Sequence, residues 1–392
     1  MIAMENFESV FGKKPGYLFS APGRTELSGN HTDHQHGRVL AAAVNLDTRA
    51  QVRENGENVI RVFSRGFGLS EIDLSVLTPQ EDEKGSTKAL IRGVAAAIAQ
   101  RGFELRGFDA YVWSSVLPGS GLSSSAAFEV LIGTILNHIC ACSLTAVEIA
   151  QIGQYAENVF FGKPCGLMDQ TASSVGNVVT IDFADNSAPV VTPIDFDFAS
   201  CGYSLCIIDS GADHADLTDE YAAIPGELKA VCRSFGKEFL REIPEEEFYA
   251  GLVKARAAAG DRAILRAIHV YEDNKRVAKQ AEALSKGDFE GFLSHVKASG
   301  DSSWMYLQNV IPTGNTAHQE LALAIAVCDK LLGGRGACRV HGGGFAGTLQ
   351  AFVPVDMLDE FKRGIENVLG EGSCHVLSIR PDGGVLLEVY ND

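Results

Sequence analysis

The spacing of hydrophobic residues changes sharply across residues 117–123. On the N-terminal side, residues 108–116 alternate between apolar and other side chains, which predicts a β-strand. On the C-terminal side, Ala127, Leu131 and Ile135 recur every four residues and form one apolar stripe of a helix. The segment between them is rich in glycine and serine, so we expect a strand, a loop and a helix in that order.

The same two periodicities predict the rest of the architecture. Strands and helices do not alternate regularly along the chain, which favours an α+β fold over a doubly wound parallel sheet. A chain of 392 residues is too long for a single core. Residues 186–198 are loose and rich in Asp and Pro, so we place the boundary near residue 195, between domains 1–195 and 196–392. The predicted strands are 17–21, 39–52, 59–63, 177–183 and 203–208, and the predicted helices are 88–100, 145–161, 262–284 and 316–332.

The loop before the helix has the composition of an anion site. Gly119 and Gly121 allow the backbone to approach a ligand closely, and the serines that follow can cap the helix. Unpaired N–H groups and the helix dipole favour an anion there, and we expect a phosphate. The loop lacks the lysine of a Walker A motif and the third glycine of the dinucleotide fingerprint. An ordinary loop with a serine cap is the alternative.

A second polar stretch lies at residues 21–37, where an arginine, an amide, a carboxylate and three histidines fall within a few residues of one another. The pattern His31, His34, His36 suggests a metal site. Its spacing does not match helical zinc pairs, however, and no cysteine lies nearby. A hydrogen-bonding site for a polyol fits these groups better, and a purely structural polar loop is the alternative.

Two more stretches complete a set of phosphoryl-transfer groups. Asp169 directly follows the apolar residues Leu167 and Met168, and a carboxylate in such a setting needs a partner such as Arg24. Glu157 lies on the helix that precedes this stretch. Residues 342–347 hold four glycines, which suits close backbone approach to a ligand. Phosphoryl transfer depends mainly on positioning and on neutralising charge around phosphate and Mg²⁺. These residues therefore predict a nucleotide-dependent kinase.

Composition narrows the partners and the compartment. A formal net charge of −17 argues against nucleic acid and anionic membranes as partners. The nine cysteines form no C-x-x-C pair, and several lie in apolar runs, which suits reduced thiols in a cytoplasmic protein. We recognise no signal peptide and no run long enough to span a membrane. We expect a monomer or a homodimer that binds small molecules.

Taken together, the motifs resemble those of the GHMP small-molecule kinases and, within them, of the galactokinases. Residues 118–127, P-G-S-G-L-S-S-S-A-A, match the family motif P-x-G-x-G-L-S-S-S-A-A with one position fewer between the proline and the leucine, and a G-G-G-F-G-G type loop matches residues 342–347. The galactokinase signature G-R-x-x-L-x-G-x-H-T-D matches residues 23–33, and C-G-I-M-D-Q resembles residues 165–170. The resemblance covers nearly the whole chain.

This resemblance implies a fold and a set of roles. It implies the two-domain GHMP kinase fold, with an N-terminal ribosomal-S5-domain-2-like domain, a C-terminal ferredoxin-like domain and the active site in the cleft between them. Asp169 would accept the proton of the sugar's anomeric hydroxyl, and Arg24 would keep Asp169 ionised. Glu157 and Ser125, with Ser124 as the alternative to Ser125, would bind Mg²⁺. The implied nucleotide-binding residues are Pro118, Gly119, Ser120, Gly121, Leu122, Ser123, Ser124, Gly343 and Gly344, and the implied sugar-binding residues are Asn30, His31, Asp33, Gly166 and Tyr221.

The chain also departs from the galactokinase pattern. Galactokinases usually have G-E-H-T-D-Y, whose glutamate contacts the sugar's 6-hydroxyl, whereas this chain has Asn30 and His34 at the Glu and Tyr positions. A glutamate about 4 Å from a C6 carboxylate would cost about 4 kcal/mol at an effective dielectric of about 20. Asparagine avoids that repulsion and can donate a hydrogen bond. Because most of the chain resembles the galactokinases, D-galactose with ATP is the expected substrate pair. Asn30 and His34 motivate a second hypothesis, galacturonate or another C6-altered sugar or polyol, and a non-catalytic sugar sensor is a third.

Overall fold

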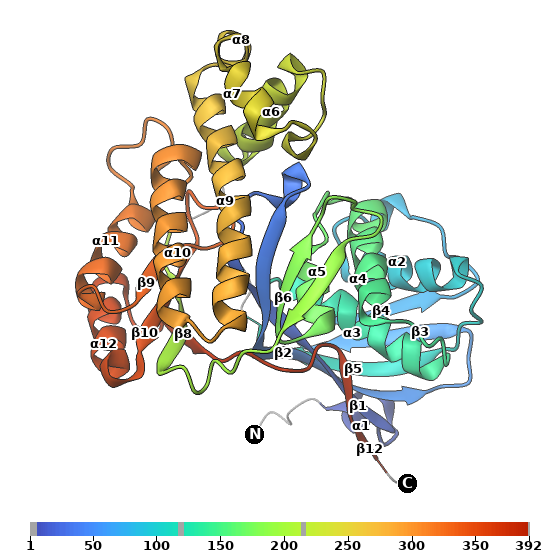
Figure 1. Cartoon of the computed structure of the whole chain (residues 1–392). Coiled ribbons are helices and arrows are strands. Elements are labelled where there is room, and N and C mark those ends of the chain that lie inside the picture. The colour runs from blue at the N-terminus through green and yellow to red at the C-terminus, as the bar shows by residue number, and fades with distance from the viewer. Residues whose placement is uncertain (1–5, 117–120, 213–216, 391–392) are drawn as a thin grey trace.

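The computed structural model describes residues 6–116, 121–212 and 217–390, which form two β-sheets with helices packed around each (Figure 1). The larger sheet has the strand order β12-β1-β2-β5-β3-β4, and β6 and β7 extend from β2. Its pairs are antiparallel except for β3 with β5. Its strands are β1 (Tyr17–Ser28), β2 (Arg38–Glu54), β3 (Val59–Ser64), β4 (Gly68–Asp73), β5 (Phe108–Ser114), β6 (Val178–Asp182), β7 (Val190–Ile194) and β12 (Val385–Val389).

Strand β2 organises this sheet because it is long enough to serve two sets of neighbours. Along one edge it pairs with β1. Along the other edge, residues 38–42 pair with β6 and residues 48–54 pair with β5. The sheet therefore branches at residues 43–47 of β2, which lie opposite residues 22–24 of β1.

Three helices contact the strands of the larger sheet, namely α2 (Thr87–Gln100), α3 (Ser124–Ile139) and α5 (Met168–Val175), and α4 (Ala146–Tyr155) packs on these helices. Thr145 caps α4 through a capping box with Glu148, at the residue where the sequence predicts the helix to begin. Helix α4 then widens into a π-helical segment, η3 (Ala156–Phe161), a geometry that is frequent at functional sites. The buried apolar side chains between these helices and the sheet include Ile91, Val94, Leu131, Ile135, Val52, Val62 and Ala110.

The smaller sheet has the order β11-β8-β10-β9 and is antiparallel. Alternate residues of β8 point to opposite faces, so Cys206 and Ile208 pack with α11 and α12, whereas Leu205 and Ile207 lie in the cluster that includes side chains of α9 and α10. Its strands are β8 (Tyr203–Asp209), β9 (Ala337–Val340), β10 (Thr348–Pro354) and β11 (Cys374–Leu377), and its helices are α9 (Asp261–Ser285), α10 (Phe289–Ser302), α11 (Glu320–Leu332) and α12 (Leu358–Leu369).

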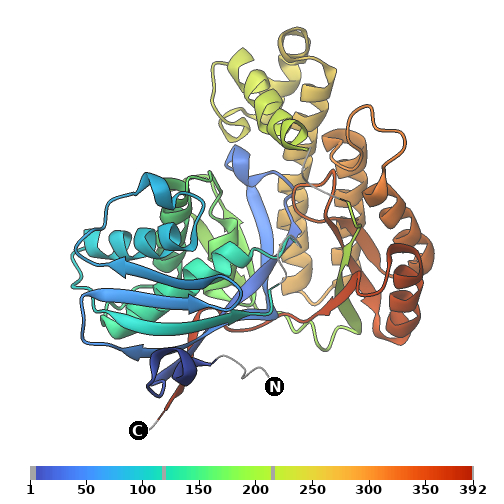
Figure 2. The same cartoon turned by 180° about the vertical axis from the view of Figure 1, so that it is seen from behind.

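Further helices lie at one end of α9, where α6, α7 and α8 form a group with their own apolar cluster (Figure 2). Helix α10 continues into a second π-helical segment, η5 (Ser303–Leu307). No helix in residues 6–116, 121–212 and 217–390 combines the length and apolar character needed to cross a bilayer. The bounds of the remaining helices are α1 (Phe7–Phe11), α6 (Thr218–Ser234), α7 (Glu245–Ala250) and α8 (Leu252–Ala259), with short 3₁₀ turns η1 (Asp33–Gln35), η2 (Glu81–Glu83), η4 (Leu240–Glu242) and η6 (Val355–Met357).

The α+β class is confirmed, and the predicted strands and helices are present with shifted ends. Two sequence expectations are wrong. Strand β1 does not stop at residue 21 but continues to Ser28 through Pro22 and Gly23, with register shifts that absorb the proline. The segment 186–198, expected to be loose, contains strand β7. The division near residue 195 stays a prediction.

The two sheets meet at the second half of β1. The carbonyl of Leu27 accepts hydrogen bonds from Arg339 Nη1 in β9 (3.2 Å) and from Gln350 Nε2 in β10 (3.0 Å). Leu27 also belongs to an apolar cluster that joins β2 to α9, α10 and β10. This junction brings the polar residues of β1 against the glycine-rich segment that follows β9.

Candidate active site

A cavity of about 330 Å³ lies where β1, the start of α3, the start of α5 and the glycine-rich segment 342–347 come together. These segments are far apart in sequence, so the fold assembles the motifs that the sequence singles out. Polar and glycine residues make up almost all of the cavity wall. The lining residues are Arg24, Gly121, Ser123, Ser124, Ser125, Lys163, Asp169, His341, Gly342, Gly343, Gly344, Ala346, Gly347 and Thr348.

The central feature of the cavity is an ion pair between Arg24 and Asp169. Arg24 Nε and Nη2 each lie 2.7 Å from Asp169 Oδ1, and the Ser123 hydroxyl donates to Oδ2. Burial acts to raise the pKa of Asp169, but the Arg24 guanidinium and the Ser123 hydroxyl outweigh it and hold the pKa below its usual value. The Asp169 side chain is still 31% exposed. Asp169 is thus an ionised carboxylate that a ligand can reach.

The backbone of β1 fixes the position of Arg24. Its N–H donates to the carbonyl of Leu122 (3.0 Å), and its Nη1 donates to the carbonyl of Gly121. A Cβ at Gly23 would lie 2.9 Å from the Leu122 oxygen, so only glycine allows the strand to approach the loop this closely. Leu122 itself is fully buried in the apolar cluster between the sheets, so its side chain anchors the loop.

The start of α3 differs from the simple serine cap that the sequence suggests. Ser123 has a left-handed backbone (φ 54°), and its side chain makes no capping bond because it is used on Asp169. Ser124 and Ser125 lie in the first helical turn and line the cavity. Free N–H groups of a first turn and the helix dipole favour an anion at this position. Pro118, Gly119 and Ser120, expected at the nucleotide, lie outside the described residues.

Glu157, carried by the π-helical segment η3, lies behind the cavity wall, next to the lining residues Ser125 and Lys163. It is only 3% exposed, and its Oε1 lies 3.3 Å from Ser125 Oγ and 3.3 Å from Lys163 Nζ. A buried carboxylate needs a cation, and a carboxylate with a hydroxyl oxygen is a donor set that suits Mg²⁺. Burial acts to lower the pKa of Lys163, but the Glu157 and Asp169 carboxylates raise it above its usual value.

Gln170 links Glu157 to a third carboxylate. Its Nε2 donates to Glu157 Oε2 and to Glu129 Oε2, each at 2.9 Å. Glu129 is fully buried in α3, and burial together with the nearby Glu157 raises its pKa well above the usual value. Glu129 is therefore a neutral acid in a cluster whose other carboxylates are paired with cations. The sequence predicted no role for Lys163, Gln170 and Glu129, and the one available signal is a glutamate among the apolar residues of α3.

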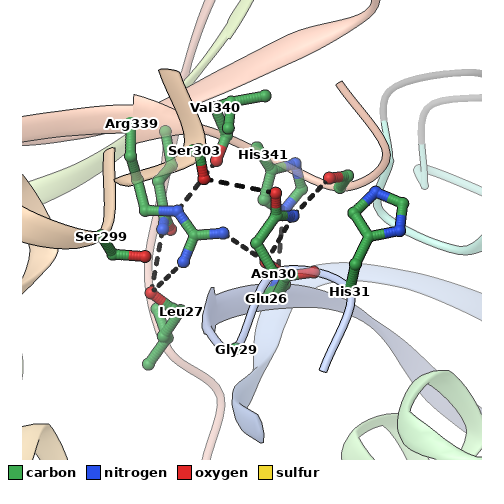
Figure 3. A network of polar contacts seen from close by, with 12 residues as sticks. Glu26, Leu27, Gly29, Asn30, His31, Ser299, Ser303, Arg339, Val340 and His341 are labelled. Atoms are coloured by element: carbon green, nitrogen blue, oxygen red, sulfur yellow. Dashed lines mark hydrogen bonds and ion pairs between the residues drawn. The ribbon is translucent and has the colours of Figure 1, made fainter. Parts of the chain in front are cut away.

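Asn30 lies in a buried network behind the cavity (Figure 3). Its Nδ2 donates to the carbonyl of Gly342 (2.6 Å) and to Glu26 Oε1 (3.2 Å), while its Oδ1 accepts from Asn309 Nδ2 (2.8 Å) and from Ser303 Oγ (3.4 Å). Asn30 has no exposed surface, and its amide already uses four hydrogen bonds within the protein. This placement does not support a direct contact between Asn30 and a sugar.

The same network contains a buried ion pair between Glu26 and Arg339. Glu26 Oε1 accepts from Arg339 Nη2, and Arg339 is itself almost fully buried. Burial raises the pKa of Glu26, and the pairing with Arg339 opposes that rise. Two acceptors, the Gly342 carbonyl and the Glu26 carboxylate, thus face residue 30, which requires a donor at that position.

The other residues expected at the sugar lie near the same edge. His31 Nε2 lies 3.0 Å from the Gly343 carbonyl, and burial, together with the neighbouring His34, lowers the pKa of His31 to about 4. Asp33 and Gly166 are neighbours, because a Cβ added to Gly166 would lie 2.7 Å from Asp33 Oδ2. The metal alternative raised for the histidines gains no support, because the described residues contain no group of three or more His, Cys, Asp and Glu side chains that could hold a metal ion.

Tyr221 supports the glycine-rich segment from the side of α6. Its hydroxyl donates to the Gly344 carbonyl (2.7 Å), and its ring packs so closely on Gly343 that a Cβ there would lie 2.5 Å from Cε1. Burial raises the pKa of Tyr221 to about 12, which keeps the phenol protonated. Gly343 and Gly344 therefore line the cavity with backbone that Tyr221 holds in place.

Replacing Glu129 with glutamine should stabilise the protein increasingly as the pH rises. Above about pH 4.5 the unfolded state releases the Glu129 proton, whereas the folded state keeps it. The free energy of unfolding of wild type therefore falls by up to about 1.4 kcal/mol per pH unit between about pH 4.5 and the raised pKa of Glu129. Glu129→Gln removes this loss, and urea unfolding at pH 5 to 8 measures it.

A matched control is Glu83→Gln. It removes a carboxylate that pairs with Arg92 at 2.7 Å, a pairing that lowers the pKa of Glu83. This variant should be less stable than wild type by an amount that does not change between pH 6 and 8. A difference between Glu129→Gln and wild type that stays constant with pH would contradict the neutral state of Glu129.

Comparisons with known proteins identify the family. The model of the GHMP kinases N-terminal domain matches residues 89–177, and the galactokinase galactose-binding signature matches residues 5–54. A galactokinase of Actinobacillus pleuropneumoniae serotype 5b is 31% identical over 364 residues, covering 92% of this chain and 91% of the relative. A galactokinase of Streptomyces coelicolor is 31% identical, covering 93% and 91%.

Solved structures agree with the sequence relatives. The crystal structure of Lactococcus lactis galactokinase complexed with galactose matches with a TM-score of 0.82 at 25% identity, covering 97% of this chain and 98% of that one. A mevalonate kinase matches with a TM-score of 0.66 at 14% identity, covering 93% and 99%, which indicates a shared fold. The expected two-domain GHMP kinase fold is confirmed. The chain is an enzyme of the galactokinase family of the GHMP kinases.

Proposed function

We propose that this protein transfers the γ-phosphoryl group of ATP to the C1 hydroxyl of D-galactose. The observation that carries the proposal is the reachable Asp169 carboxylate, held ionised by Arg24 in a cavity walled by serine hydroxyls and glycine backbone. The match to a galactokinase complexed with galactose over nearly the full chain supports galactose as the acceptor.

The chemistry follows from these positions. The sugar O1 attacks the γ-phosphorus, the bond from that phosphorus to the bridging oxygen of ADP breaks, and the O1 proton passes to Asp169. Arg24 and Ser123 hold the two carboxylate oxygens, so Asp169 needs little reorientation when it accepts the proton. Arg24 also places positive charge beside the position where negative charge develops on the phosphoryl group.

ATP binding is assigned to the two loops that face each other across the cavity. The first turn of α3 with Gly121, Ser123 and Ser124, and the backbone of Gly343 and Gly344, offer N–H donors to phosphate oxygens. The preceding residues 118–120 belong to the same loop in sequence. Ser125 and Glu157 would hold Mg²⁺, which when bound neutralises phosphate charge.

The sugar is assigned to the edge formed by His31, Asp33 and Gly166, next to the segment that Tyr221 supports. Asn30 acts indirectly, because its side chain is buried and binds Gly342. The case for galacturonate depended on an exposed Asn30 facing C6, so the buried position weakens it. The intact Arg24 and Asp169 pair disfavours a silent sensor. A monomer or homodimer in the cytoplasm stays the expectation.

A coupled ADP-release assay with galactose, galacturonate, glucuronate and N-acetylgalactosamine tests the function. Galactose should give the highest kcat/KM, and Asp169→Asn should lower that value about 10²- to 10⁴-fold while ATP binding, measured calorimetrically, changes little. Asp182→Asn is the control, because Asp182 also pairs with arginines, Arg38 at 2.7 Å and Arg241 at 2.9 Å, but does not line the cavity. The Asp182→Asn variant should keep wild-type turnover. Wild type without ADP release on galactose would refute the proposal.

The burial of Asn30 gives a second prediction. Asn30→Glu would place a carboxylate against the Glu26 carboxylate and the Gly342 carbonyl, and such uncompensated buried charge should cost about 3 to 5 kcal/mol in urea unfolding. In the double mutant Glu26→Gln/Asn30→Glu the buried carboxylate lies at residue 30 and no longer faces a second one. The double-mutant cycle should therefore show a favourable coupling energy of about 1 to 3 kcal/mol between the two substitutions.

Two results would contradict this reading of Asn30. The first is an additive cycle, in which Asn30→Glu costs the same with and without Glu26. The second is a stable Asn30→Glu protein whose only change is its preference between galactose and galacturonate, which would place residue 30 at the sugar.

A further inference from the structure

We propose that Lys163 is an exchangeable cation of the active site: it occupies Glu157 in the nucleotide-free protein, gives way when the metal arrives, and then binds the phosphoryl groups of ATP. The inference rests on the proposed function, which supplies the nucleotide and the metal. It concerns a residue outside all four motifs that identify the family.

The first argument is that Glu157 offers a cation only one oxygen. Its Oε2 already accepts from Gln170 Nε2 at 2.9 Å, in a buried position. The other oxygen, Oε1, faces both Ser125 Oγ and Lys163 Nζ, each at 3.3 Å. A metal ion held by Glu157 and Ser125 must therefore approach the oxygen on which the Lys163 ammonium rests. Two cations on one oxygen repel each other, so the metal and Lys163 compete for Glu157.

The second argument is that Lys163 can move while its backbone stays fixed. Its N–H donates to the carbonyl of Glu157 (3.1 Å), directly after Gly162 ends the π-helical segment with φ 87°. The side chain is 65% exposed and lines the cavity. A four-carbon stem anchored at this point allows the ammonium to leave Glu157 without any change in the fold.

The third argument is the shortage of free positive charge on the cavity wall. Among the described lining residues, Arg24 is the one arginine and Lys163 the one lysine. Arg24 is bound to Asp169 and to Gly121. His341 is buried, and burial lowers its pKa well below the usual value, so it is neutral. The serine loop lacks the lysine that a Walker A loop supplies to phosphates. Lys163 supplies that missing charge from another segment.

The test is Lys163→Met, which keeps the length of the stem and removes the charge. Two effects of opposite sign are expected. Without nucleotide, Mn²⁺ should bind about 5- to 10-fold more tightly, because its competitor for Glu157 is gone, as measured by electron paramagnetic resonance. At saturating Mg²⁺, ATP should bind at least about 10-fold more weakly, because the metal has freed Lys163 from Glu157 and the variant lacks this phosphate partner, as measured by calorimetry. Lys163→Arg keeps the charge and should retain ATP affinity within about threefold.

Lys84→Met is the matched control. Lys84 lies beside Gly162, with Cγ 3.9 Å from the position of a Cβ there, but its ammonium pairs with Glu81 at 2.7 Å and does not line the cavity. It should change neither affinity. If Lys163→Met leaves Mn²⁺ and ATP affinity within twofold of wild type, the inference is wrong. If only Mn²⁺ binding tightens, Lys163 does not bind the phosphates of ATP. If only ATP binding weakens, Lys163 does not compete with the metal for Glu157.

These binding measurements use no sugar, so they are separate from the test of the proposed function. Wild type that phosphorylates galactose while Lys163→Met binds both ligands like wild type would overturn the role of Lys163 alone. Wild type that shows no turnover on galactose, with both shifts present in Lys163→Met, would overturn the sugar and support the role of Lys163.

Discussion

Three consecutive side chains of β1 hold the active site together. Arg24 binds Asp169 at the start of α5, Thr25 Oγ1 lies 3.1 Å from His341 Nε2, and Glu26 binds Arg339 in β9. The first contact reaches α5, and the other two cross from the larger sheet to the end of β9 and the residue that follows it. Because each bond involves a buried group that would be costly to leave unpaired, the strand fixes the relative positions of its partners. The geometry around Asp169 depends on this strand.

The local elements were largely predictable because they follow from short-range patterns. The strand before residue 117, the amphipathic helix after it and the capping box at Thr145 depend on neighbouring residues alone. The continuation of β1 through Pro22 and Gly23 was not predictable in this way. Those residues usually end a strand, and the reason they do not here is the contact with the Leu122 carbonyl, about a hundred positions away in the chain.

The site was predictable in its residue types and less so in its contacts. The family motifs pointed to Arg24 and Asp169, and the structure pairs them across 145 positions. The same motifs suggested that Asn30 meets the sugar, whereas its amide is used by Asn309, Ser303, Glu26 and Gly342. Three of those four partners lie more than 270 positions away, so no local pattern could reveal that Asn30 is buried.

Charge balance explains how a protein with a formal net charge of −17 can receive a polyanionic nucleotide. Three carboxylates lie on the cavity wall or directly behind it, and each has a different environment. Asp169 is balanced by Arg24, Glu157 by Lys163, and Glu129 is neutral through burial. Paired in this way, these groups add little net negative charge to the cavity. The dipole of α3 then dominates locally, and it favours an anion at the serines of its first turn.

If Glu129 were ionised, it would add an unpaired negative charge beside Gln170 and oppose both the nucleotide and the ionised state of Asp169. The burial that keeps Glu129 neutral is therefore part of what makes the site able to bind phosphate.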